Sequence, residues 1–172
     1  MDTNSGNQSI TDLSAIIEGL GKAGVEFVLV GGLAAVAQGA PVTTMDVDIV
    51  HKRSSENLSR LFRFLKSIDA IYRRPDDKII VPKEEDFSGH ALFSTRLGPL
   101  DVLAFIEGNR GYEDLLKDTV EIDFRGYTIR VLDIRTIIGL KKHSRDPKDK
   151  QRLPVLEETL RQLDDHSEID KT

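Results

Sequence analysis

The stretch VLVGGLAAVAQGAPVTTMDVDIV, residues 28–50, decides the fold. With Phe27 before it, the unbroken apolar run at residues 27–30 predicts a strand that is buried on both faces. Gly31 and Gly32 end this strand, and residues 33–38 predict a short helix. Because glycine has no side chain, backbone N–H groups at this turn can approach a phosphate closely, although a tight turn alone would also need glycine.

The second half of the stretch predicts a strand with one apolar face and one acidic face. Asp46 and Asp48 alternate with apolar residues within residues 43–51. Their Cα atoms should lie roughly 7 Å apart, so the two carboxylates can share hard cations. A third acid, Asp101, lies in LDVLAF at residues 100–105, which predicts a neighbouring strand that brings it to the same cluster.

Three clustered carboxylates repel one another, so such a site implies bound magnesium or protonated carboxyl groups. In a two-metal arrangement one ion activates an attacking hydroxyl, while the other holds a triphosphate and stabilises the leaving pyrophosphate. The cluster therefore predicts two Mg²⁺ ions and a nucleoside triphosphate. The simpler alternative is that these aspartates are turn, capping or solvated residues, as aspartates near strand starts commonly are.

The remaining segments complete a mixed α/β (α+β) pattern. Four further helices are predicted. The first is capped by Thr11, the second begins at Ser54 or Ser55, and the third follows Asp133. The fourth covers the leucines of residues 153–163, where Pro154 restricts its start or introduces a kink. Predicted strands are KIIVP (78–82), ALFSTR (91–96), LDVLAF, and a hairpin in EIDFRGYTIRVL (121–132) that turns at Arg125-Gly126. We expect one domain over residues 9–165, a mixed β-sheet flanked by helices with a helical C-terminal extension, and flexible tails at 1–8 and 166–172.

Composition narrows the function classes. The 172 residues include no cysteine, which excludes thiol chemistry and thiolate zinc sites, and the formal charge of -5 argues against a surface for duplex DNA. No apolar run approaches the roughly 20 residues of a membrane span, and the start lacks a secretory pattern, so we expect a soluble cytoplasmic protein. Neither a P-loop nor a Gly-x-Ser-x-Gly elbow is present, and no paired spacing for catalytic zinc links the histidines at positions 51, 90, 143 and 166.

The order of strand, Gly-Gly, short helix, Asp-x-Asp strand and later acid resembles the nucleotidyltransferase superfamily. The segment LKKHSRDPKDK, residues 140–150, is similar to small bacterial nucleotidyltransferase-like proteins of abortive-infection and toxin–antitoxin systems. In those proteins a helix bearing a lysine precedes a Lys-Asp pair, here Lys148 and Asp149. The likeness spans about residues 24–163. Many relatives carry an arginine two places before Thr44, where this chain has Val42.

The resemblance implies a nucleotidyltransferase fold and magnesium-dependent transfer of a nucleoside monophosphate from an NTP to a hydroxyl acceptor. It implies an RNA such as tRNA, a protein side chain or a small molecule as acceptor, and a cognate toxin or antitoxin as partner. The residues implied are Asp46, Asp48 and Asp101 for metal binding and catalysis, and Gly31, Gly32, Thr44 and Lys141 for nucleotide binding. Lys141 also fits a purely structural role, because lysine near a helix end is favoured by the helix dipole.

Two other classes of function stay open. A binding module on the same fold would keep nucleotide or partner binding without turnover, and a replaced metal acid would indicate it, but all three acids are present. A protein-interaction domain would show a long exposed apolar stripe, whereas the predicted stripes are used by the core.

Overall fold

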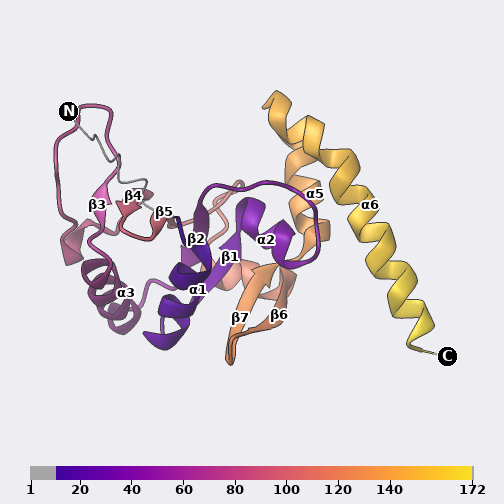
Figure 1. The fold of residues 1–172 in the computed structure, drawn as a ribbon, viewed down its shortest axis with the longest axis horizontal. Helices are drawn as coiled ribbons and strands as arrows, with labels where there is room; N and C mark the ends of the chain where they lie inside the picture. Colours follow the sequence, from indigo (N-terminus) through magenta and orange to yellow (C-terminus); the bar gives the residue numbers. More distant parts are fainter. Residues whose placement is uncertain (1–10, 172) are drawn as a thin grey trace, which may run out of the picture.

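The computed structural model describes residues 11–171, which form a seven-stranded mixed sheet covered by helices (Figure 1). The strand order is β3-β4-β5-β2-β1-β7-β6. Strands β2 and β5 are parallel, as are β1 and β7, and the other neighbours are antiparallel. The strands are β1 (Phe27–Val30), β2 (Val47–His51), β3 (Ile71–Tyr72), β4 (Ala91–Thr95), β5 (Gly98–Leu103), β6 (Thr119–Phe124) and β7 (Tyr127–Leu132).

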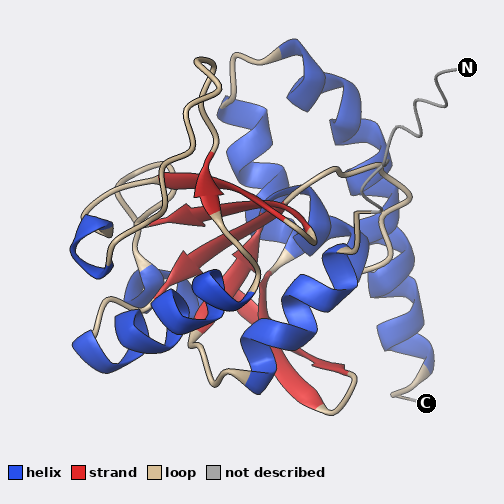
Figure 2. Ribbon diagram, turned by 60° about the vertical axis from the view of Figure 1, so that its left-hand side comes forward, coloured by secondary structure: helices blue, strands red, loops and turns tan. Residues whose placement is uncertain are grey.

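Helices lie around the sheet on more than one side (Figure 2). Helix α1 contacts α3, and α2 contacts β1, β2 and β7. Helix α5 packs on the long helix α6, and this pair lies at the end of the molecule opposite to α3 in Figure 1. The helical segments are α1 (Leu13–Lys22), α2 (Gly31–Ala37), α3 (Ser55–Ser67), η1 (Glu84–Asp86), α4 (Tyr112–Leu115), η2 (Leu116–Asp118), α5 (Ile134–His143) and α6 (Pro147–Ile169).

The central strands follow the sequence pattern closely. All four residues of β1 are buried, as the apolar run predicted, because the strand lies between β2 and β7 and contacts α2 and α4. The hairpin between β6 and β7 turns at Arg125 and Gly126, and Ser54 caps α3 by accepting a hydrogen bond from the Asn57 N–H. These predictions are confirmed.

Other boundaries differ from the sequence predictions. Asp12, not Thr11, caps α1, since its carboxylate accepts from the Ala15 N–H at 3.0 Å. The predicted strand KIIVP is wrong: residues 78–82 form no strand, and Ile79 and Val81 are exposed. Helix α6 begins at Pro147 and continues through Pro154.

The predicted tail at residues 1–8 lies outside the described residues, and α6 extends into the other predicted tail, as far as Ile169. None of the helices within residues 11–171 is both long and apolar enough to cross a membrane.

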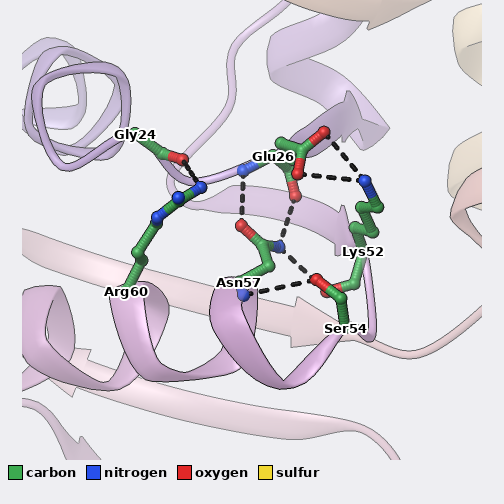
Figure 3. Close-up of polar contacts among 6 residues, drawn as sticks. All are labelled: Gly24, Glu26, Lys52, Ser54, Asn57 and Arg60. Atoms are coloured by element: carbon green, nitrogen blue, oxygen red, sulfur yellow. Dashed lines mark hydrogen bonds and ion pairs between the residues drawn. The ribbon is translucent and has the colours of Figure 1, made fainter.

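A buried asparagine joins the start of α3 to the ends of two central strands (Figure 3). Asn57 is fully buried, and its amide donates to the carbonyls of Glu26 at 2.9 Å and Lys52 at 2.8 Å. Its side-chain oxygen accepts from the Glu26 N–H at 2.7 Å. The side chains of Glu26 and Lys52 form an ion pair above it, with atoms 3.1 Å apart. One side chain therefore satisfies three backbone groups from two segments.

We predict that Asn57→Ala lowers the free energy of unfolding by about 3 kcal/mol, because three backbone groups lose a partner at once. For a chain of this size the melting temperature should fall by roughly 5–10 °C. Urea and thermal unfolding measure both values. The control is Gln162→Ala, which removes one hydrogen bond on the exposed side of α6 and should change stability by less than about 0.5 kcal/mol. Equal effects of the two substitutions would contradict the prediction.

Candidate active site

The structure brings the three predicted acids together. Asp48 on β2 lies opposite Asp101 on β5 in the parallel register, so both side chains are on the same face of the sheet. Asp46 lies immediately before β2, which begins at Val47 and not at the predicted residue 43. Carboxylate oxygens of the three residues lie within 4.8 Å of one another. Neighbouring strands thus gather three oxygen ligands at one point.

The Gly-Gly turn lies directly beside this cluster. Gly31 has a φ of +70°, and a Cβ atom there would collide with the carboxylate of Asp48. A Cβ atom on Gly32 would lie 3.1 Å from the Thr44 hydroxyl, which itself donates to the Asp46 carbonyl at 3.3 Å. Glycine is therefore required at Gly31 by backbone and space, and Thr44 supports the segment that carries Asp46.

Lys141 faces the same region from α5. It lines a cavity of about 340 Å³ together with Gly31, Asp48 and Asp149. Only 15% of its side chain is exposed, and its Nζ lies 2.7 Å from Asp149 Oδ1. Helix α6 therefore covers Lys141, although the residue lies near the end of α5. The apolar part of the cavity wall consists of Val30, Leu103, Ile106, Leu132, Ile137 and Leu140.

Two arginines that the sequence analysis missed complete the surroundings. Arg73, just after β3, donates to Asp101 Oδ1 at 2.8 Å and to the Phe93 carbonyl at 2.9 Å. Arg152 on α6 donates to the Thr43 carbonyl at 3.1 Å, and its guanidinium lies close to Gly32. Many relatives have an arginine at the position of Val42. In this chain, Arg152 of α6 brings a guanidinium group to the neighbouring residue Thr43 instead. No local motif marked either residue.

Burial of the carboxylates is the main influence on their pKa values. Burial raises the pKa of Asp48 to about 7, and the charges of Asp46 and Asp101 add to this rise. Burial also raises the pKa of Asp101, while the Arg73 guanidinium acts in the opposite direction. A further cation placed among these oxygens would favour their ionised forms.

The cluster fits a divalent cation. Carboxylate oxygens are the ligands that magnesium prefers, and oxygens of three aspartates converge here. Burial raises the pKa values of Asp48 and Asp101, and a bound cation would favour their ionised forms. Arg73 contacts one oxygen of Asp101, so oxygens of all three acids are left as ligands. Asp46, Asp48 and Asp101 are the residues that would hold the ion.

The histidines do not contribute a metal site. His51 is fully buried, burial lowers its pKa, and its Nδ1 makes a hydrogen bond of 3.0 Å with the Leu103 carbonyl. The His90 ring contacts the Phe105 ring at a tilt, with ring centroids 4.7 Å apart, near the end of β5. Within residues 11–171, the one group of acids and histidines with metal-ligand spacing is the aspartate cluster.

The mixed α/β fold predicted from the sequence is confirmed, because the structure shares its fold with a solved nucleotidyltransferase. The lincomycin-bound lincosamide antibiotic adenylyltransferase LnuA aligns with 86% of this chain and 97% of its own, with a TM-score of 0.58 and 15% identity. The antibiotic-resistance factor ANT(2'')-Ia aligns with 84% and 80%, with a TM-score of 0.51 and 13% identity. No protein-family model matches the chain, and comparison with curated protein sequences finds no match.

We predict that Asp48→Asn stabilises the metal-free protein at pH 8. The pKa of Asp48 in the fold lies above its ordinary value of 3.8, so its contribution to stability is complete below about pH 4 and is lost as the pH rises through about 7. Asparagine has no such loss. In EDTA, the melting temperature of the variant should exceed that of the parent by a few degrees at pH 8 and by little at pH 5.

The control is Asp165→Asn, which removes a carboxylate from the exposed face of α6. It should not reproduce the pH-dependent gain. The melting temperature of the parent in EDTA should fall more between pH 5 and pH 8 than that of Asp48→Asn. Equal falls would contradict the raised pKa of Asp48.

Proposed function

We propose that this chain transfers a nucleoside monophosphate from an NTP to a hydroxyl group of an acceptor and releases pyrophosphate. The observation that carries the proposal is the convergence of Asp46, Asp48 and Asp101 beside a cavity that also contains Gly31 and Lys141. The likeness in fold to a lincosamide adenylyltransferase supports the same class of reaction.

In the proposed reaction the three aspartates hold two magnesium ions. When bound, magnesium supplies positive charge that neutralises the triphosphate and the leaving pyrophosphate. Asp46 and Asp48 would retain the nucleotide through the bound magnesium. Without the metal, the triphosphate oxygens and these carboxylates repel each other.

The chain's own residues bind the triphosphate and handle the proton. Lys141 offers an ammonium group in the cavity, and Gly31 and Gly32 leave the turn open to a phosphate. Asp101 positions the acceptor hydroxyl and takes its proton. The hydroxyl oxygen forms a bond to the α-phosphorus, and the bond between that phosphorus and the bridging oxygen of pyrophosphate breaks.

The acceptor class is part of the proposal. Of the two solved structures compared above, one is a lincosamide antibiotic adenylyltransferase with lincomycin bound and the other is an antibiotic-resistance factor, which supports a small molecule as the acceptor for this chain as well. RNA and protein side chains are the other acceptors that the sequence resemblance implies. The toxin–antitoxin setting stays a prediction from the sequence.

A second candidate is a module that binds a nucleotide without turnover. The contact of Arg73 with Asp101 favours it, because this guanidinium contacts the acid that would accept the proton. The two candidates differ in one measurable step. Both bind MgNTP, whereas the enzyme alone transfers label from an α-labelled NTP to an acceptor.

The test is binding and transfer by the parent protein and by Asp101→Asn. Calorimetry with each NTP at physiological salt should show binding in magnesium and much weaker binding in EDTA. Asp101→Asn should bind MgNTP nearly as well as the parent and lose label transfer by on the order of a hundredfold or more. Transfer is assayed with hydroxylated small molecules, RNA and protein, and Asp165→Asn serves as the charge-matched control.

Equal NTP affinity with and without magnesium would overturn the metal-bridged site. A parent that binds MgNTP but labels no acceptor would favour the binding module. Full activity of Asp101→Asn would remove this residue from the mechanism.

Lys141→Ala should weaken MgNTP binding by roughly tenfold or more, because a partly buried ammonium group in the cavity is lost. The matched control is Lys142→Ala on the same helix, whose lysine is exposed and pairs with Glu157 at 3.2 Å. The control should bind as the parent does. Both variants are compared by calorimetry and by melting temperature, and equal affinities would assign Lys141 to the ion pair with Asp149 alone.

A further inference from the structure

A second cavity, lined mainly by α1 and α3, is surrounded by positive charge. Its volume is about 520 Å³, and its walls come from α1, α3 and the turn between β4 and β5. Four basic residues, Lys22, Arg60, Arg63 and Arg96, line it, and no aspartate or glutamate does. The chain as a whole carries a net charge of -5, so this concentration of cations is opposite to the average surface.

The cavity has a packed apolar floor. Ala15, Gly19 and Ala23 follow one another along one side of α1, and small residues at this spacing keep the wall open. Gly19 lies so close to the Phe64 ring that a Cβ atom there would collide with it. The four basic side chains therefore surround a concave surface that is formed by the packing of α1 against α3.

The basic groups have few partners in the described part of the chain. Arg60 donates to the Gly24 carbonyl at 3.4 Å (Figure 3), and Arg63 donates to the Ser59 carbonyl of its own helix at 3.4 Å. Arg96 donates to the Ser67 carbonyl at 3.2 Å and lies 3.9 Å from Asp69.

Each arginine has five N–H donors, so most of these donors are left for a ligand. Within residues 11–171, Asp69 is the acidic residue that pairs with one of these four basic residues, Arg96. Its side chain is 79% exposed, so it neutralises little of their charge.

We propose that this cavity binds phosphate groups, two or more of them on a single ligand. Guanidinium groups recognise phosphate through paired N–H donors, and several cations around one concave surface strengthen the attraction. The α1 wall from residue 15 to residue 23 is roughly 12 Å long, which accommodates more than one phosphate. The ligand is either a free oligophosphate or the sugar-phosphate backbone of an RNA strand.

This site is independent of the proposed transfer reaction. Its positive charge comes from side chains, so binding should need no magnesium, whereas the aspartate cluster repels phosphate when no metal is present. Binding measured in EDTA therefore reports the basic cavity alone.

The experiment is calorimetry in EDTA at low salt with two probes: inorganic tripolyphosphate and a short single-stranded RNA without a terminal triphosphate. The test variant is Lys22→Gln with Arg63→Gln. Within residues 11–171 the Arg63 guanidinium donates to its own helix and the Lys22 ammonium group forms no ion pair, so folding should be preserved. The matched control is Arg135→Gln with Arg161→Gln, which removes two cations from α5 and α6. Melting temperatures confirm that both variants are folded.

The parent should bind at least one probe, and the test variant should lose at least tenfold in affinity while the control loses less than twofold. Binding of tripolyphosphate alone identifies a free oligophosphate as the ligand, and binding of RNA identifies the backbone. Absence of binding to both probes would overturn the proposal. So would equal losses in the test variant and the control.

Discussion

Burial of three neighbouring carboxylates, together with their mutual repulsion, is the constraint on which the candidate site depends. The parallel pairing of β2 with β5 places Asp48 opposite Asp101, and the turn before β2 adds Asp46. The surrounding structure compensates only in part. Arg73 approaches from the far side of β4, and Lys141 lies across the cavity in an ion pair with an aspartate of α6. The pKa of Asp48 stays raised despite these two cations, so a further cation among the three carboxylates would favour their ionised forms.

The sequence predicted those parts of the fold whose surroundings are encoded locally. Residues 27–30 are apolar without interruption, and the strand they form is central. Alternation around Asp46 and Asp48 marked a strand with an acidic side, and the LDVLAF segment supplied its parallel neighbour with Asp101. These predictions needed only strand periodicity and the short turns between elements. The metal and nucleotide roles of the acids stay predictions.

Features that depend on contacts between distant segments could not be predicted. Arg152 and Thr43 are 109 positions apart, and no local pattern links them. Lys141 follows the rule for a lysine near a helix end until α6 is packed over it. The KIIVP segment at residues 78–82 has the composition of a strand, but a strand also requires a continuous ladder of backbone pairs. The hydrogen bond from the Tyr72 N–H to the Ile80 carbonyl, at 2.9 Å, does not extend into such a ladder.

The order of strands also determines how the sheet ends. One edge is β3, which has only two residues, and the other is β6, which presents exposed Glu121 and Asp123. A short edge offers few free backbone groups, and two copies of β6 brought side by side would place carboxylates against carboxylates. Both ends of the sheet therefore disfavour the addition of a strand from another molecule, which protects the folded chain from edge-to-edge aggregation.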